Sequence, residues 1–186
     1  EFLNEFLESH LATPIALVES TANEAFNVQT PEEKAQLERD LKLKAGSIDG
    51  VLGLHIALKG DKTLYSSEQL SLAADYDSNT RDWFIEAMEN PQQVVITDPY
   101  VDAITGKLIV GVSKVMNGGE GVVTLDLDLA FLQELVPTIT IGEEGYTFVF
   151  DNNGNVLYHP VYEQSESVVD VPFYKAFIEN ALIETE

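Results

Sequence analysis

Hydrophobic residues in the first quarter of the chain recur at helical spacing. Residues 1–45 contain few turn-forming residues, and their apolar positions lie three or four apart, so they share one face of a helix. The positions that define this face at the start of the chain are Phe2, Leu3, Phe6, Leu7, His10 and Leu11. The pattern predicts an N-terminal helical stalk over residues 1–46.

Two breaks are expected within this helical segment. Thr13 before Pro14 is typical of a cap or a kink. Thr30, followed by Pro31 and Glu33, matches a capping box with proline at the first helical position. Gly46 is expected to end the second helix.

From residue 50 the hydrophobic pattern changes to short runs rich in β-forming residues. VLGLHIAL at 51–58 and TLYSS at 63–67 flank the turn-like KGDK, which predicts a hairpin. A short helix is expected at 80–89, and the last two of the strands after it flank the turn NGGE. Those strands are predicted at 93–97, 107–115 and 121–128. This order of elements predicts an antiparallel sheet with helices beside it.

A second and shorter β unit is predicted after residue 136. YTFVF at 146–150 and VLYHP at 156–160 flank the turn DNNGN, and a helix is expected at 172–182. The order of strands and helix in this unit partly repeats the order in the first unit. The expected boundaries are therefore 47–136 for the first module and 137–186 for the second.

Composition narrows the classes of partner. The chain has 186 residues, of which 45% are hydrophobic, so it can bury a sizeable core. Its formal net charge of −22 would repel nucleic acid and anionic lipid. This acidity favours an adaptation of the whole surface to salt, to high pH or to solubility over a single acidic site.

Cysteine is absent, so no disulfide framework or thiolate metal site is expected. No run approaches the roughly 18 apolar residues of a membrane span, and the N-terminal sequence EFLNEFLESH lacks the pattern of a signal peptide. The segment as given is therefore expected to be soluble, with membrane contact only through flanking segments that it does not contain.

The most informative residues lie in YDSNTRDWF. The chain has two arginines, Arg39 and Arg81, and a single tryptophan, Trp83, two residues after the second arginine. A guanidinium offers a planar fork of donors that matches a carboxylate, and an indole adds an N–H donor and a stacking surface. The pair suits the α-carboxylate of a small zwitterion.

The ammonium group of such a ligand needs carboxylate or carbonyl acceptors. Asp98, Asp102 and Asp126 follow the short helix on a loop and a strand, and any of them is a candidate. The alternative is structural: Arg81 pairs with Asp77 or Asp82 at a helix start, and Trp83 fills core. Residue types leave both readings open.

Four segments in this order and spacing resemble the double Cache sensor domain of bacterial methyl-accepting chemotaxis receptors, of the amino-acid-binding type. They are YDSNTRDWF, ITDPYVDAITGKLIVGVSKV, GVVTLDLDL and IGEEGYTFVFDNNGNVLYHP. The similarity covers about residues 30–160. It implies an α+β fold: a long N-terminal helix followed by two PAS-like (Cache) modules with antiparallel sheets, the ligand being held in the membrane-distal one.

The resemblance also implies a ligand site. It places Tyr76, Arg81 and Trp83 toward the ligand carboxylate, and Tyr100, Asp102 and Asp126 toward its ammonium. Phe84 departs from the family pattern, which has tyrosine there, so one phenolic hydrogen bond is expected to be missing from the site. The run Leu70, Leu72, Ala73 and Ala74 suggests a small or apolar wall at the side-chain end. Because the chain stops at Glu186, the second module is expected to be truncated.

The expected function is that of an extracytoplasmic ligand-sensing domain. It would bind a small amino acid and transmit a conformational signal across the membrane for chemotaxis, as a homodimer formed through the N-terminal helix. The alternatives are the sensor domain of a histidine kinase or cyclase, the binding of another small carboxylate or amine, and a structural domain whose pocket is filled by its own side chains.

Catalytic and metal chemistry are not expected. His10, His55 and His159 lie apart without the close spacing of zinc ligands, so packing roles are expected for them. DNNGN lacks the glutamate that ends an EF-hand loop, because Tyr162 occupies that position. No hydrolase motif is present. The prediction is a binding domain that has no cofactor and is not an enzyme.

Overall fold

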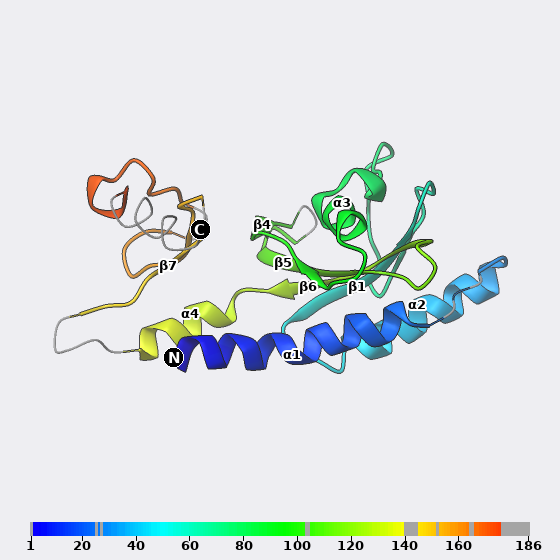
Figure 1. Ribbon diagram of the computed structural model, residues 1–186, viewed down its shortest axis with the longest axis horizontal. Helices are drawn as coiled ribbons and strands as arrows, with labels where there is room; N and C mark the ends of the chain where they lie inside the picture. Colours follow the sequence, from blue (N-terminus) through cyan, green and yellow to red (C-terminus); the bar gives the residue numbers. More distant parts are fainter. Residues whose placement is uncertain are drawn as a thin grey trace.

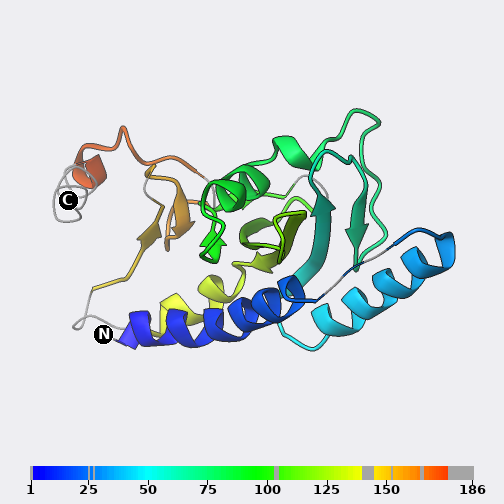
Figure 2. The ribbon, with the colours of Figure 1, turned by 45° about the vertical axis from the view of Figure 1, so that its right-hand side comes forward.

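The computed structural model describes residues 2–24, 26, 28–102, 105–139, 145–151, 153–163 and 166–175. Two N-terminal helices lie along one face of an antiparallel sheet, and a short helix lies on the other face (Figure 1). A smaller β unit follows toward the C-terminus (Figure 2). The mixed helical and antiparallel character predicted from the sequence is confirmed. Among the helices of the described residues, none has the length and apolarity needed to cross a membrane.

The first helix, α1 (Phe2–Ala22), passes through Pro14 without ending. The expectation of a cap at Thr13 is therefore wrong. A proline inside a helix removes one backbone hydrogen bond. The turns after Pro14 carry Val18 and Ala22, which are buried against the sheet, and this packing holds the segment helical.

The second helix, α2 (Pro31–Ala45), begins at the predicted capping box. The Thr30 hydroxyl accepts a hydrogen bond from the Glu33 backbone N–H at 3.2 Å, and the Glu33 carboxylate accepts the N–H of Thr30 at 2.9 Å. Backbone donors from Gln29 and Thr30 lower the pKa of Glu33. Gly46 ends the helix, as expected.

The main sheet has the strand order β2-β1-β6-β5-β3, and β4 also pairs with β5. Three long strands form its centre: β1 (Val51–Leu58), β6 (Gly121–Asp128) and β5 (Leu108–Val115). Short strands flank them: β2 (Leu64–Ser66), β3 (Val95–Ile96) and β4 (Tyr100–Val101). Each predicted strand of this sheet is present, although β3 is shorter than predicted. The pattern did not predict β4.

The predicted short helix consists of two pieces. The 3-10 turn η1 (Ser78–Thr80) leads into α3 (Asp82–Glu89), and Arg81 lies between them. Asp77 caps η1 by accepting the Asn79 backbone N–H at 3.0 Å. The side-chain amide of Asn79 in turn donates to the carbonyl groups of Leu58 and Asp61, at 3.1 and 2.9 Å. These bonds tie the segment before α3 to the turn between β1 and β2.

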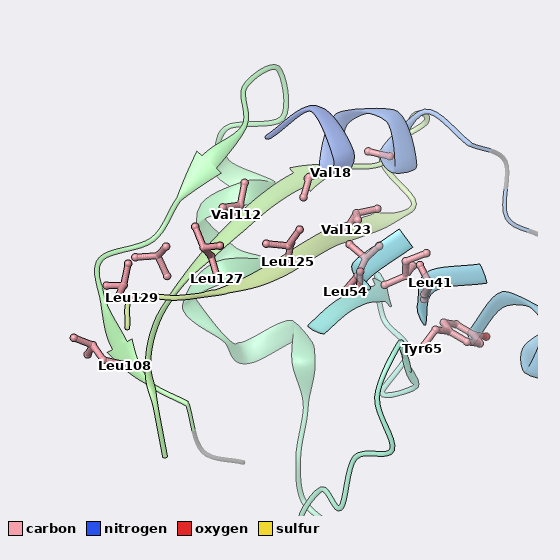
Figure 3. Packing of buried hydrophobic residues seen from close by; sticks show 14 of the residues in the cluster. Val18, Leu41, Leu54, Tyr65, Leu108, Val112, Val123, Leu125, Leu127 and Leu129 are labelled. Carbon is pink, nitrogen blue, oxygen red and sulfur yellow. The ribbon is translucent and has the colours of Figure 1, made fainter. Parts of the chain in front are cut away.

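The main core lies between the sheet and the two N-terminal helices. Successive residues of a strand point to opposite faces, so alternate residues of the central strands face α1 and α2. Figure 3 shows Leu54, Val112, Val123, Leu125 and Leu127 on this face, with Val18 and Leu41 opposite them. Most of these side chains are almost fully buried.

The second β unit follows α4 (Phe131–Leu135) and η2 (Val136–Thr138). Its strands β7 (Val149–Phe150) and β8 (Val156–Tyr158) pair antiparallel, which confirms the predicted hairpin. In the turn, the Asp151 carboxylate accepts the backbone N–H groups of Asn153 and Asn155, both at 2.8 Å. Of the predicted 172–182 helix, residues 172–175 are helical, and the remainder lies outside the described residues.

Candidate functional site

A pocket of about 290 Å³ opens between the sheet, the start of α3 and the loop after β2. This volume is at the lower end of the range for small-molecule sites, about 300–1,000 Å³. The residues that line it are His55, Leu64, Leu70, Ser71, Leu72, Ala73, Tyr76, Arg81, Trp83, Tyr100, Asp102, Thr124 and Asp126. The pocket thus brings together all the predicted site residues except Phe84.

The floor of the pocket follows from the register of the three central strands. On the face beneath α3, residues form three rows across β1, β6 and β5. The rows are Gly53, Asp126 and Gly111; His55, Thr124 and Ser113; and Ala57, Val122 and Val115. The third row is apolar and packs against Trp83, Phe84 and Ala87 of α3. The first two rows carry glycine or polar residues, and three of them, His55, Thr124 and Asp126, line the pocket.

Arg81 is the exposed N-cap residue of α3 and lines the pocket. Its guanidinium carbon lies 6.0 Å from the centre of the Tyr76 ring. Within the described part of the chain, no carboxylate lies within 4.0 Å of this guanidinium. Asp77 instead faces Lys62 at 4.0 Å and caps η1. The structural alternative, in which Arg81 pairs with Asp77 or Asp82, is not what the structure shows.

Trp83 combines both expected roles. Its indole is 7% exposed, packs edge to face on Phe84 with ring centres 5.8 Å apart, and also lines the pocket. Phe84 itself is buried in the apolar cluster beneath α3 and is absent from the pocket lining. Adjacent residues on a helix point about 100° apart, and here that turn directs Phe84 toward the apolar cluster. The hydroxyl missing at position 84 therefore leaves no gap in this pocket.

Asp102 and Tyr100 reach the pocket from β4 and the tight turn that follows it. The Asp102 carboxylate accepts hydrogen bonds from the backbone N–H and the hydroxyl of Thr105, at 2.7 and 2.6 Å. Gly106 adopts a positive φ of 70°, and its N–H donates to the Asp102 carbonyl at 2.9 Å. The turn therefore fixes the direction of the Asp102 side chain. Asp98, a further candidate acceptor, is exposed and does not line the pocket.

The two pocket tyrosines keep their protons and can donate hydrogen bonds. Burial raises the pKa of Tyr100, and the carboxylates of Asp126 and Asp102 raise it further. Burial also raises the pKa of Tyr76, but there the strongest charge is the guanidinium of Arg81, which lowers it. Both phenols thus lie within the influence of the same three charged residues, Arg81, Asp102 and Asp126.

Sequence reasoning missed two polar residues of the floor, His55 and Thr124. His55 is 6% exposed; its Nδ1 lies 2.9 Å from the Ser66 hydroxyl and its Nε2 lies 3.1 Å from Asp126 Oδ2. Thr124 accepts a hydrogen bond from the Ser113 hydroxyl at 2.8 Å. The alternation within VLGLHIAL carried a signal for His55, because it places Gly53 and His55 on the same strand face.

The apolar wall was predicted more fully. Leu70, Leu72 and Ala73 line the pocket beside Leu64 and Ser71, whereas Ala74 does not. The charged residues of the lining are one cation, Arg81, and two anions, Asp102 and Asp126. Such a pocket can hold a small molecule that carries a negative and a positive group.

Comparison with known proteins provides evidence on the family and the fold of this chain. The family model described as a Cache domain matches residues 1–181. The chemotaxis protein McpC of Bacillus subtilis, a methyl-accepting type, is 29% identical over 157 residues. That match covers 83% of this chain but only 24% of McpC, so the chain spans about a quarter of the length of this curated relative.

Two solved structures share the fold. The ligand-binding domain of the Pseudomonas aeruginosa PAO1 amino-acid chemoreceptor PctB, in complex with L-Gln, is 28% identical and has a TM-score of 0.67. That match covers 88% of this chain and 67% of PctB's. The corresponding domain of the chemoreceptor PctC, in complex with GABA, is 23% identical with a TM-score of 0.73 and covers 90% and 75% of the two chains.

Proposed function

Because this chain belongs to the Cache domain family, we propose that it is the extracytoplasmic ligand-sensing domain of a chemotaxis receptor and that it binds a small amino acid. Its relatives include chemotaxis proteins of the methyl-accepting type, and PctB binds L-Gln. In this role the domain captures its ligand and performs no reaction on it.

One observation carries the proposal: Arg81, which forms no ion pair among the residues that the structure describes, shares a small pocket with two carboxylates. The guanidinium of Arg81, the Trp83 indole and the Tyr76 phenol bind the ligand's α-carboxylate. At the other end, Asp126, Asp102 and Tyr100 bind its ammonium. A zwitterion satisfies both ends, whereas a simple anion would meet an excess of negative charge.

The domain organisation completes the proposal. Residues 1–46 form the helical stalk, residues 47–136 the membrane-distal ligand module, and residues 137–186 belong to the membrane-proximal module. Two copies associate through the N-terminal helix, and flanking segments connect the domain to the membrane. The domain therefore lies on the outer face of the membrane and reports inward.

The route of the signal follows from β6. Asp126 faces the pocket, while its neighbour Leu125 is fully buried in the core that contacts α1 and α2. A ligand that draws Asp126 toward the pocket therefore acts directly on the surface against which α1 packs. The bound and free states then differ in the position of α1, and the ligand shifts the balance between them.

Thermal denaturation in the presence of each standard amino acid tests this function. A ligand at 100 times its dissociation constant adds about 2.7 kcal/mol to the free energy of unfolding, so at least one amino acid should raise Tm clearly. Arg81→Ala should abolish the rise and leave the ligand-free Tm unchanged. Arg39→Ala removes the other arginine, which lies on α2 and bonds to Gln36, and should retain the rise. A Tm unmoved by every amino acid, or an equal rise in Arg81→Ala, would overturn the proposal.

A further inference from the structure

His55 lies between β2 and β6 and connects their polar side chains. Its Nδ1 contacts the hydroxyl of Ser66, and its Nε2 contacts Asp126 Oδ2. The Ser66 hydroxyl oxygen also accepts the backbone N–H of Glu68 at 2.9 Å. A continuous hydrogen-bonded chain therefore runs from the backbone after β2 to the Asp126 carboxylate, which lines the pocket.

The position of the imidazole depends on the absence of a side chain at Gly53. Gly53 lies two residues before His55 on the same face of β1 and pairs with Asp126 across the sheet. A Cβ built on Gly53 would lie 2.5 Å from His55 Nε2 and 2.7 Å from Cε1. The ring occupies the space that any other residue at position 53 would fill, and from there it reaches Asp126.

The chain of hydrogen bonds fixes where the proton of a neutral His55 resides. An ionised carboxylate only accepts hydrogen bonds, so Nε2 must carry a hydrogen. The Ser66 hydroxyl already accepts the Glu68 N–H and can turn its own hydrogen toward Nδ1. Protonation at Nδ1 reverses that last bond but leaves the Asp126 contact intact. The network accommodates both charge states of the imidazole.

We propose that His55 is a positioning residue for the ligand's ammonium group: it orients Asp126, and its protonation weakens ligand binding. The inference rests on the proposed function and adds its regulation. A charged imidazole at 3.1 Å pairs with the carboxylate that the ammonium would otherwise use. It also places a second cation beside the incoming one. Binding of a zwitterion and protonation of His55 therefore oppose each other.

The other ionisable groups at the pocket belong to several elements. Asp102 and Tyr100 come from β4 and its turn, and Tyr76 and Arg81 from the segment before α3. With His55 neutral, the lining carries one negative charge in excess; with His55 protonated, the charges balance. A small ligand with a second cationic group should therefore be affected more strongly by acid than a neutral zwitterion.

The first test needs no ligand. The chain has three histidines, so nitrogen NMR of the imidazoles is readily assigned with His55→Gln and His10→Gln variants. At about pH 8, where an unperturbed imidazole is neutral, His55 should carry its proton on Nε2. A proton on Nδ1 would overturn the proposal, whether or not any amino acid binds.

The second test measures the rise in Tm caused by a mixture of the neutral standard amino acids other than histidine, at about pH 7 and about pH 5.5, the range in which histidine changes charge. In the wild-type chain the apparent affinity should fall about threefold or more toward the lower pH. His55→Gln keeps an N–H donor for Asp126 but cannot titrate, so it should bind with little dependence on pH. His10→Gln removes an imidazole outside the pocket and should behave as the wild type.

Two further variants separate orientation from charge. His55→Leu removes the donor to Asp126 and should weaken binding at both pH values. Gly53→Ala leaves His55 in the sequence but displaces its ring, so it should weaken binding in the same way while the chain stays folded. The proposal fails if His55→Gln retains the wild-type pH dependence, or if His55→Leu and Gly53→Ala both bind as the wild type does. If the mixture stabilises no variant at either pH, the proposed function fails, and the NMR experiment alone decides the tautomer.

Discussion

The two faces of the main sheet differ sharply although the same strands supply both. Leu54, Leu125 and Val112 point toward the N-terminal helices and are completely buried in an apolar layer. Their neighbours in the sequence, His55, Asp126 and Gly111, point to the other side. On that side, two of the three rows consist of glycine and polar residues, and His55, Thr124 and Asp126 line the pocket.

This difference shows how one set of strands separates stability from binding. The helix face removes apolar area from water, which is the main source of folding free energy. The pocket face buries less apolar area, so it contributes less folding free energy, and it presents hydrogen-bonding groups to the pocket. Substitutions on the helix face should therefore change mostly stability, and those of the pocket residues that bind the charged groups of the ligand should change mostly affinity.

Neighbouring residues of β6 provide the test with the largest expected effect. Leu125→Ala should lower the free energy of unfolding by about 2–5 kcal/mol, because it leaves a cavity in a fully buried layer. Asp126→Asn should change it by less than about 1 kcal/mol yet abolish the rise in Tm caused by amino acids. Urea denaturation with and without ligand measures both. Equal losses of stability in the two variants would contradict the separation of the faces.

A smaller effect is expected for the second row of the pocket floor. Thr124→Val removes the acceptor for the buried Ser113 hydroxyl and should cost about 1–3 kcal/mol. The double variant Ser113→Ala with Thr124→Val removes both partners and should recover most of that loss. Denaturation of the single and double variants measures the coupling energy between Ser113 and Thr124. Additive losses in the free energy of unfolding would show that their hydrogen bond does not contribute to stability.

The capping box of α2 should matter to stability alone. Thr30→Ala leaves the Glu33 N–H without its acceptor and should cost about 1 kcal/mol, with no change in ligand affinity. Ser20→Ala, which removes an exposed hydroxyl within α1, should cost less than about 0.5 kcal/mol. An altered ligand affinity in Thr30→Ala would mean that the helix layer and the pocket are more tightly connected than the faces suggest.

The smallest effect concerns pH and sharpens the contrast between two buried histidines. His159 Nδ1 accepts the backbone N–H groups of Val161 and Tyr162, so Nε2 carries the hydrogen and donates to Tyr174 at 2.7 Å. The hydrogen bond between Tyr174 and Tyr146, together with burial, raises the pKa of Tyr174 to about 12, so the Tyr174 phenol stays neutral. A protonated His159 would lose both backbone bonds. His55, in contrast, tolerates either state.

Burial lowers the pKa of His159 below the ordinary 6.5. The unfolded chain therefore binds a proton more readily than the folded one, and stability should be constant above about pH 6.5 and decrease as pH falls through and below that value. Thermal denaturation between about pH 8 and pH 5 measures this slope. His159→Gln should reduce this slope.

Much of the fold could be predicted because its signals are local. The capping box at Thr30, the alternation in β1 and the turn between β5 and β6 each lie within a few residues of sequence. The two-residue strand β4 has no such pattern and forms because β5 offers it a partner. The cap expected at Thr13 is absent because the local cost of Pro14 in the helix is outweighed by packing against the distant sheet.

The site was predicted as far as residue types and family resemblance allow. The alternation of β1 indicates the face on which His55 lies but not its partners. Ser66 and Asp126 are 11 and 71 residues away, and the place of the ring depends on the absence of a side chain at Gly53. Phe84 illustrates the opposite error. It adjoins a pocket residue in the sequence, but the turn of α3 directs it into the core.

The alternation along β1 and β6 has a consequence for how such a sensor acquires new ligands. Codons for pocket and core alternate, so mutations that redesign recognition need not disturb the layer that keeps the domain folded. A combinatorial library confined to Leu70, Leu72 and Ala73, which line the pocket outside the core, would vary ligand recognition on a fixed scaffold. The same arrangement makes the domain a convenient starting point for engineered biosensors, in which a new analyte would cause the movement of α1 that we propose for the natural ligand.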